Sequence, residues 1–310
     1  MSHTLRPMTR PALVLGGTGL LGHGVVASFL DRGLDVRATT RHPELVPDDK
    51  ASLFEEFGVA DGDLGKLVAG YGSGDFVVNC VGLIKPYIRD EDLGDRRRAI
   101  AVNADFPHAL AEFASAQGFR VIHITTDCVF SGGRGSYLET DRHDATDVYG
   151  MSKSLGEVPG PGIVNLRCSV IGQEMRGFKS LLQWVLGHAS GETFRGYTDH
   201  QWNGVTAMAF GRIIAGIVAT GNPVSGTVHV VPADSVNKYE LSAMILEAYG
   251  RGDVSVLPYE TGTMVNRVLG TVNADVNARL WADAGYGAIP AIEQLVHEMP
   301  TTREPYRGKP

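Results

Sequence analysis

The chain is poor in cysteine and contains no long apolar run, and each absence excludes a class of protein. Its 310 residues hold three cysteines, Cys80, Cys128 and Cys168. They are far apart and odd in number, whereas a secreted protein of this size normally pairs its cysteines. No window approaches the roughly 18 apolar residues of a membrane span, and the first residues lack the apolar core of a signal peptide. We therefore expect a cytoplasmic protein that does not enter a membrane.

The chain also lacks an excess of basic residues. It carries 28 Lys and Arg against 35 Asp and Glu, a formal net charge of −7. This balance argues against a broad basic surface for nucleic acid. The sharpest basic run, residues 96–98, follows acidic residues at 90–92 and 95 and is typical of a solvated helix face. No run of residues has metal-ligand spacing, so we expect neither a nucleic-acid partner nor a bound metal.

Glycine, in contrast, is abundant. The chain holds 39 glycines, about 13% of its residues against a usual ~7%. They follow no fixed period and form no Gly/Ser tract. We therefore expect them in turns and where the backbone approaches another group closely.

Short apolar runs alternate with helical patterns in the first half of the chain. The runs at 12–15, 36–39, 76–81 and 120–125 predict strands, and the spacing in 20–30, 64–71 and 96–117 predicts helices. The stretch 43–62 is ambiguous. Alternating strands and helices predict an α/β fold, a Rossmann-type, doubly wound, mostly parallel sheet covered on both faces. Ligands of such sheets bind at the carboxyl ends of the strands.

The pattern changes after Gly172. Helices are predicted at 178–188, 208–219 and 238–249, a strand at 226–231, and two short helices within 276–299. We expect an NAD(P)-binding domain at 1–172, with return elements at about 205–232. A smaller, mixed C-terminal lobe would bind the substrate with residues 173–204 and 233–310.

A glycine-rich loop joins the first predicted strand to the first predicted helix. Gly16, Gly19 and Gly22 give G-x-x-G-x-x-G. In this position the first glycine permits a tight turn, the second admits a pyrophosphate and the third lets helix and strand pack closely. The free N–H groups of the helix start then face the phosphates. We expect a dinucleotide here, also contacted by Thr18, Leu20 and Leu21.

The end of the second strand indicates which dinucleotide binds. An Asp or Glu about 20 residues beyond the loop would hold the ribose hydroxyls of NAD, but no acid occurs before Glu44. Thr40 and Arg41 suit a 2′-phosphate, since a guanidinium matches phosphate geometry. We therefore expect NADP(H) rather than NAD(H). Asp63 either accepts a hydrogen bond from the adenine amino group or caps the following helix.

Tyr149 and Lys153 form a Y-x-x-x-K pair. Residues four apart share one face of a helix. A nearby ammonium favours the phenolate, so we expect a lowered pKa for Tyr149 and an acid–base group useful near neutral pH. A predicted strand that ends in Thr125-Thr126-Asp127 lies between this pair and the glycine loop.

Seven strings together resemble the extended short-chain dehydrogenase/reductases, and within them the dTDP-4-dehydrorhamnose reductase branch. In chain order they are GGTGLLG (16–22), NCVG (79–82), VNADFP (102–107), HITTDCVFSG (123–132), VYGMSKSLGE (148–157), LRCSVIG (166–172) and GTVHVV (226–231). They span most of the chain, and their order and spacing are more specific than any single string.

The resemblance implies a catalytic triad of Thr126, Tyr149 and Lys153 in an often dimeric enzyme. Hydride from NADPH would reach a sugar keto carbon, Tyr149 would protonate the developing alkoxide, and Lys153 would also reach the cofactor ribose. Further cofactor contacts are expected at Leu64, Cys80, Val81, Gly82 and Asn103. Asn103 has either a structural or a proton-relay role.

The implied substrate is a nucleoside-diphosphate keto-deoxysugar. Asp127 and Cys128 would lie beside it, and its pyrophosphate would need donors, for which the candidates are Lys85, Arg176, Lys179, Gln201 and Asn203. Trp184 and Trp202 could stack on a base or sugar, although core packing is the favoured role of Trp184. Arg167, at a strand end, could instead form a buried structural pair.

Cys128 departs from the family pattern. Related dehydratases have glutamate at its position and rhamnose-type reductases have tyrosine. Two alternatives therefore stay open: an NAD-dependent epimerase or dehydratase, which the acid-free second strand and Cys128 disfavour, and a non-catalytic, cofactor-binding regulatory subunit, which Tyr149 and Lys153 disfavour.

Overall fold

A seven-stranded parallel sheet forms the centre of the molecule. The computed structural model describes residues 10–300. The sheet order is β11-β6-β5-β4-β1-β2-β3, and every neighbouring pair is parallel. The strands are β1 (Ala12–Leu15), β2 (Val36–Thr40), β3 (Phe54–Glu56), β4 (Phe76–Asn79), β5 (Arg120–Thr126), β6 (Ile163–Cys168) and β11 (Gly226–His229). The strand order reverses at β1, which places β4 and β2 on its two sides. This confirms the predicted Rossmann-type α/β fold.

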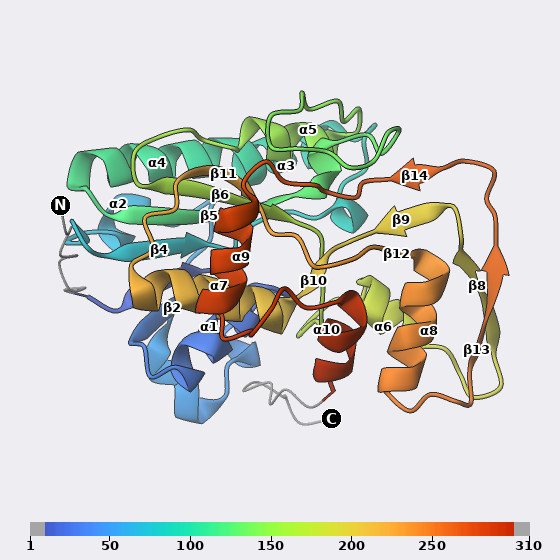
Figure 1. The fold of residues 1–310 in the computed structure, drawn as a ribbon. Helices are drawn as coiled ribbons and strands as arrows, with labels where there is room; N and C mark the ends of the chain where they lie inside the picture. The colour runs from blue at the N-terminus through green and yellow to red at the C-terminus, as the bar shows by residue number, and fades with distance from the viewer. Residues whose placement is uncertain (1–9, 301–310) are drawn as a thin grey trace.

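Helices cover both faces of the sheet (Figure 1). On one face α1 (Gly22–Asp31), α7 (Ala207–Thr220) and α9 (Ala274–Asp283) share a core with every second strand residue. On the other, α2 (Leu64–Leu67) and α4 (Phe106–Gln117) pack on the residues in between. The strands are apolar on both sides because both sides are buried.

Three predicted elements differ in detail. The helix predicted at 64–71 ends at Leu67, since Gly70 has a φ of +81°. The helix predicted at 96–117 is α3 (Leu93–Ile100) and α4, joined by a π-helical turn, Ala101–Asp105. The ambiguous stretch 43–62 contains two 3₁₀ helices (Pro43–Leu45 and Asp48–Leu53) and the edge strand β3.

A second group of elements surrounds its own apolar core to one side of the sheet (Figure 1). We call it the small-sheet region. It comprises α6 (Leu181–Leu186), β8 (Thr193–Tyr197), β9 (His200–Trp202), β12 (Val236–Asn237), α8 (Lys238–Ala248), β13 (Ser255–Tyr259), β14 (Val265–Asn266) and α10 (Ile292–Glu298). A two-stranded pair, β7 (Val170–Ile171) with β10 (Val205–Thr206), leads from the main sheet toward it. The lobe boundaries given above stay a prediction.

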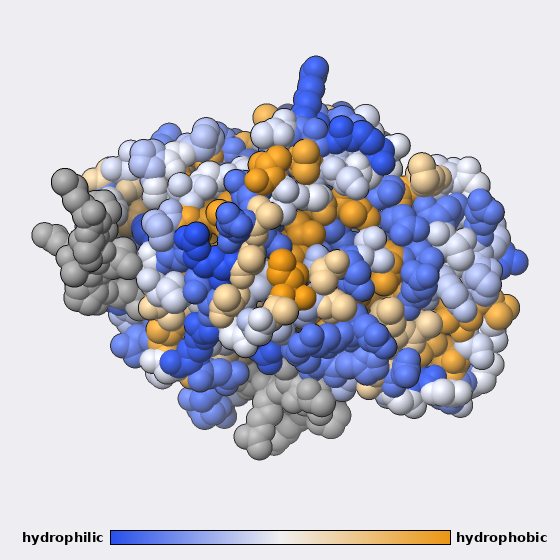
Figure 2. Space-filling view, in the orientation of Figure 1, coloured by the Kyte–Doolittle hydropathy of each residue, from blue (hydrophilic) through white to orange (hydrophobic). Residues whose placement is uncertain are grey.

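In the part of the chain that the structure describes, no helix is both long enough and apolar enough to cross a membrane. On the face shown in Figure 2, apolar side chains gather in the middle and again toward the lower right edge. The remaining short helices are 3₁₀ turns at Lys85–Tyr87 and Asp127–Val129 and the α-helix α5 (Val148–Leu155). These three follow the ends of β4 and β5 or lie beside them.

Candidate active site

The glycine loop turns tightly between β1 and α1. Gly16 has a φ of +79°, which a side chain disfavours. A Cβ on Gly22 would lie 2.1 Å from the carbonyl oxygen of Gly16, so helix and turn meet with no room for a side chain. The protein itself therefore requires glycine at both positions.

Gly19 is different. A Cβ there would have one neighbour within 4 Å, the Gly16 oxygen at 3.3 Å, so packing alone does not demand glycine. No side chain caps α1, and its first turn carries no acidic residue. A ten-residue helix whose start no side chain caps suits a phosphate. The loop therefore fits a dinucleotide pyrophosphate.

The hydroxyl groups after β2 are used within the loop. Thr39 Oγ1 accepts a bond from Gly16 N at 3.0 Å. The Thr40 hydroxyl lies 2.7 Å from that of Thr18 and accepts a bond from His42 N at 2.9 Å. Thr40 is buried, so it stiffens the loop, and its expected contact with a 2′-phosphate is not supported. Arg41 is exposed at this edge.

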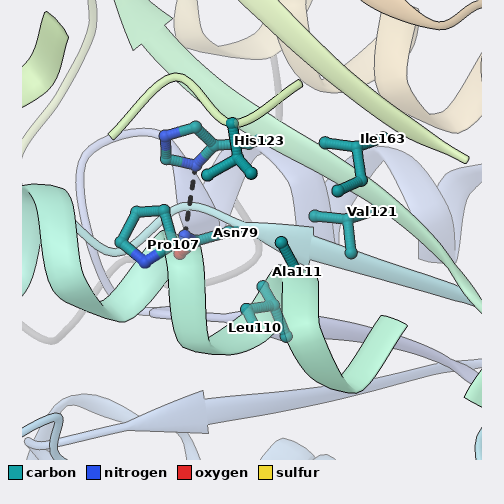
Figure 3. A pocket seen from close by; sticks show the side chains of 8 residues that line it. Asn79, Pro107, Leu110, Ala111, Val121, His123 and Ile163 are labelled. Atoms are coloured by element: carbon teal, nitrogen blue, oxygen red, sulfur yellow. Dashed lines mark hydrogen bonds between the residues drawn. The ribbon is translucent and has the colours of Figure 1, made fainter. Parts of the chain in front are cut away.

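The turn after β4 is shaped by the side-chain amide of Asn79. Asn79 Oδ1 accepts a bond from Val81 N, and Asn79 Nδ2 donates to His123 Nδ1 at 3.1 Å. Figure 3 shows this bond beside a small enclosed void, which lies in the core between the sheet and α4. Burial lowers the pKa of His123, so its imidazole is neutral. Cys80, Val81 and Gly82 are thereby held at the carboxyl end of β4.

Asn103 is a positioning residue. It is fully buried, its Oδ1 accepts from Leu83 N, and its Nδ2 donates to Leu83 O and to Ser152 Oγ. These bonds tie the loop after β4 to α5. They favour the structural one of the two roles expected for Asn103, and its cofactor contact stays a prediction.

Asp63 also has a structural bond. Its carboxylate accepts from Lys66 N at 2.9 Å and caps α2. The capping alternative is thus the one that the structure shows. Leu64, the first residue of that helix, packs partly against the core under β1 and β4.

Thr126, Tyr149 and Lys153 converge where β5 ends and α5 begins. The Thr126 hydroxyl lies near the Tyr149 phenol, whose pKa it acts to lower, and donates to Asp127 Oδ1 at 3.1 Å. Lys153 is buried and donates from Nζ to Ile124 O at 2.8 Å. Asp147 starts α5 by accepting a bond from Gly150 N, so tyrosine and lysine project from a fixed first turn.

The titration of this group differs from the sequence-based expectation. Burial raises the pKa of the Tyr149 phenol, and the neighbouring Cys128 and Asp127 raise it further. The expected lowering is wrong because desolvation of the phenolate and nearby negative charge dominate the pKa of Tyr149. Burial likewise lowers the pKa of Lys153 to about 8. Tyr149 is therefore a protonated phenol at neutral pH, which suits a proton donor.

Two cations of the small-sheet region face Asp127. Lys238 opens α8, and its ammonium lies 5.0 Å from the centre of the Trp202 ring. Arg267 follows β14 and donates from Nε to Phe130 O at 2.9 Å. The charges of both act on Asp127, although burial still raises the pKa of that carboxyl. Burial lowers the pKa of Lys238 to about 8, against the opposing pull of Asp127.

Neither cation was a sequence-based candidate. A signal for Lys238 was present, because Asn237 and Glu240 form a capping box that marks the start of a helix. Arg267 had no comparable signal, since it lies in an irregular stretch between β14 and α9.

The expected substrate donors are dispersed. Asn203 is buried and exchanges two bonds with the backbone of Leu269, so its role is structural and the substrate contact is not supported. Lys85 pairs with Asp147 at 2.8 Å, beside the start of α5. Gln201 donates to Thr198 O at 3.3 Å.

The remaining candidates lie elsewhere. Lys179 Nζ lies 4.9 Å from the centre of the Tyr87 ring. Arg176 contacts His42 after β2. Trp184 is half-exposed, so core packing is wrong for it, whereas Trp202 is buried.

Arg167 forms the buried structural pair. Its guanidinium donates to Glu157 at 2.9 and 2.5 Å and lies 2.7 Å from ring nitrogens of His143 and His229. Thr125 also donates to Glu157, at 2.7 Å. This network anchors the far end of α5 to the sheet.

The family model of the RmlD substrate binding domain matches residues 10–302. The chain belongs to this family. The match covers nearly the whole sequence and confirms the resemblance to the dTDP-4-dehydrorhamnose reductase branch.

Curated relatives of this RmlD-family chain carry different names. A dTDP-4-keto-6-deoxy-D-glucose reductase of Streptomyces niveus is 26% identical, covering 90% of this chain and 92% of that protein. The methionine adenosyltransferase 2 subunit beta of Danio rerio is also 26% identical, over 80% of this chain and 77% of its own.

Solved structures share the fold. The dTDP-4-dehydrorhamnose reductase of Bacillus anthracis in complex with NADP aligns with a TM-score of 0.72 at 18% identity, covering 95% of this chain and 99% of that one. At this identity the likeness establishes the Rossmann-type architecture.

Proposed function

We propose that this protein is an NADPH-dependent reductase of a nucleoside-diphosphate keto-deoxysugar. The observation that carries the proposal is the protonated Tyr149 phenol, which lies near Thr126 at the carboxyl end of β5, in a fold whose β1 loop fits a dinucleotide. The names of the relatives support the reductase class, and the Bacillus anthracis structure in complex with NADP supports the cofactor.

When bound, NADPH supplies a hydride to the keto carbon. The carbonyl oxygen gains the electron pair of the C=O π bond and takes the proton of Tyr149. Thr126 turns its hydroxyl hydrogen from Asp127 Oδ1 to the same oxygen, and the Lys153 ammonium favours the phenolate left on Tyr149. The raised pKa of Tyr149 ensures that the proton is present before the step.

Lys238 and Arg267 are proposed to hold the diphosphate of the substrate. They bring two positive charges to one buried carboxyl, Asp127, which leaves a surplus for an anion. Ammonium and guanidinium groups both bind phosphate oxygens, the guanidinium in a bidentate manner.

The epimerase or dehydratase alternative finds little support at Cys128. Burial raises the pKa of this thiol to about 12, so it is neutral and a poor base at physiological pH. It occupies the position at which related dehydratases carry a glutamate.

A homodimer is part of the proposal. α3 and α5 contact each other and expose Leu93, Ile100, Met151 and Leu155. Apolar side chains on adjacent helices are typical of an interaction surface. Sedimentation of the wild type and of Leu155→Glu should show a dimer and a monomer, and a monomeric wild type would remove this part.

The test of the function mixes the protein and NADPH with a panel of nucleoside-diphosphate keto sugars and follows NADPH absorbance. Oxidation with at least one sugar is expected. NADPH binding without oxidation of any substrate would favour a regulatory subunit, as the relative named a methionine adenosyltransferase subunit suggests.

A further inference from the structure

The segment between β7 and α6 is a closed loop that reaches back to the main sheet. We call residues 173–180 the strap. The two ends of the strap, which form its base, are held together, because the buried Glu174 carboxylate accepts a hydrogen bond from Ser180 N at 2.6 Å. At its tip Gly177 and Phe178 have φ angles of +90° and +49°. The base adjoins the glycine loop, since a Cβ on Gly172 would lie 3.7 Å from the Leu20 side chain.

The strap touches the loops on both sides of β1. Arg176 Nη1 lies 2.7 Å from His42 Nδ1, just after β2. Lys179 stacks on Tyr87, which follows β4, and a Cβ on Gly177 would lie 2.1 Å from the Tyr87 hydroxyl. Because β1 lies between β4 and β2 in the sheet, a segment that contacts both loops passes over the glycine loop.

The tip brings positive charge to the end of β2. Arg41 and His42 belong to this end, and Arg176 joins them from the strap. In residues 10–300 neither arginine forms an ion pair with a carboxylate. Glu44 is the opposing group, bonded to His42 Nδ1 at 3.1 Å, and His42 and Arg176 contribute to lowering the pKa of Glu44.

We propose that Arg176 reads the 2′-phosphate of NADP(H) across the bound cofactor, so that the strap takes part in selecting NADP(H) over NAD(H). The inference rests on the cofactor of the proposed function. The charge of Arg176 acts on Glu44, but neither arginine forms an ion pair with that carboxylate, and a phosphate between Arg176, Arg41 and His42 would supply a direct anionic partner. Because Arg176 lies in the strap, a bound 2′-phosphate would also stabilise the strap in its position over the cofactor.

The first test measures binding of NADPH and NADH by calorimetry to the wild type, to Arg176→Ala and to Arg279→Ala. Arg279 is an exposed arginine on α9 and serves as the control. Loss of a charged hydrogen bond predicts about 10-fold or more weaker NADPH binding by Arg176→Ala. NADH binding should stay unchanged, and Arg279→Ala should bind both like the wild type.

The second test uses trypsin on the wild-type protein, because Arg176 and Lys179 place two cleavage sites in the strap. NADPH should slow cleavage at both bonds more than NADH does at equal saturation. Equal protection by the two cofactors, or equal weakening of both by Arg176→Ala, would overturn the inference.

These outcomes are separable from the function itself. NADPH binding that depends on Arg176 without reduction of any keto sugar would support the inference and contradict the reductase. A wild type that reduces a keto sugar, with an Arg176→Ala variant that binds NADPH normally, would do the reverse.

Discussion

The two sides of the candidate site are built differently. On the sheet side, Thr126, Asn103 and Lys153 are each held by bonds to backbone or to neighbouring side chains within the sheet and α5. The other side is formed by the strap and the small-sheet region, and we call it the small-sheet side. There the Lys238 ammonium lies over the Trp202 ring and Arg176 lies against the His42 imidazole. Groups that must be placed to a fraction of an ångström for a reaction gain from a fixed surround. Groups that bind a flexible phosphate need less precise positioning. We therefore assign the chemical step to the sheet side and recognition of phosphate groups to the small-sheet side.

Tyr149→Phe tests most directly whether the sheet side carries out the chemical step. Removal of the phenolic proton should lower turnover at least about 100-fold, the usual contribution of a positioned acid. Binding of NADPH should stay as in the wild type. Steady-state rates with the keto sugar and calorimetry with NADPH check both parts.

The control is Tyr259→Phe, which removes a hydroxyl from an exposed tyrosine of β13. Its rate should match the wild type. An unchanged rate in Tyr149→Phe would mean that the sheet side does not supply the proton.

Gly22→Ala tests the rigidity of the sheet side. The new methyl group would lie 2.1 Å from the Gly16 oxygen, and relief of such overpacking typically costs about 1–3 kcal/mol of unfolding free energy. Chemical denaturation should show that loss. Gly252→Ala, where a Cβ meets nothing within 4 Å, is the matched control, and equal stability of the two variants would refute the close approach.

The sheet side could be predicted because its residues lie within a few positions of strand ends. Local spacing is enough to recognise the loop GGTGLLG and the pair of Tyr149 and Lys153. Parallel strands then bring their carboxyl ends, and the residues that follow them, to one edge of the sheet. The small-sheet side could not be predicted as a group, since Lys238, Arg267 and Arg176 come from three separate segments. Only Arg176 was a sequence-based candidate, and it was expected at the substrate pyrophosphate. Asn203 misled for another reason: a buried amide that satisfies backbone groups and one that binds a ligand look alike in a sequence.

Titration of Lys238 sharpens the division of roles. Its pKa is lowered to about 8, so the ammonium is present below pH 8 and is lost as the pH rises above it. At saturating NADPH, kcat/KM for the sugar should therefore fall above pH 8. Lys238→Arg keeps its charge and, one pH unit higher, should retain about 10-fold more of its low-pH value than the wild type.

Lys153 has a pKa of about 8 as well, but it is the same in both proteins and cancels in their ratio. The other groups near Lys238, namely Asp127, Cys128 and Arg267, are also unchanged. Parallel pH profiles of the wild type and Lys238→Arg would show that Lys238 does not bind the diphosphate.

Arg41→Ala should have the smallest effect. Arg41 belongs to the sheet side. Both arginines are exposed, but Arg176 is held against His42, whereas in residues 10–300 no hydrogen bond holds the Arg41 guanidinium in place. A loss of only about 3- to 5-fold in NADPH affinity is therefore expected for Arg41→Ala. NADH affinity should not change, and calorimetry on Arg41→Ala, Arg176→Ala and the double variant measures both. If Arg41→Ala costs more than Arg176→Ala, the 2′-phosphate is read mainly by the sheet side, and the strap then serves the substrate rather than the choice of cofactor.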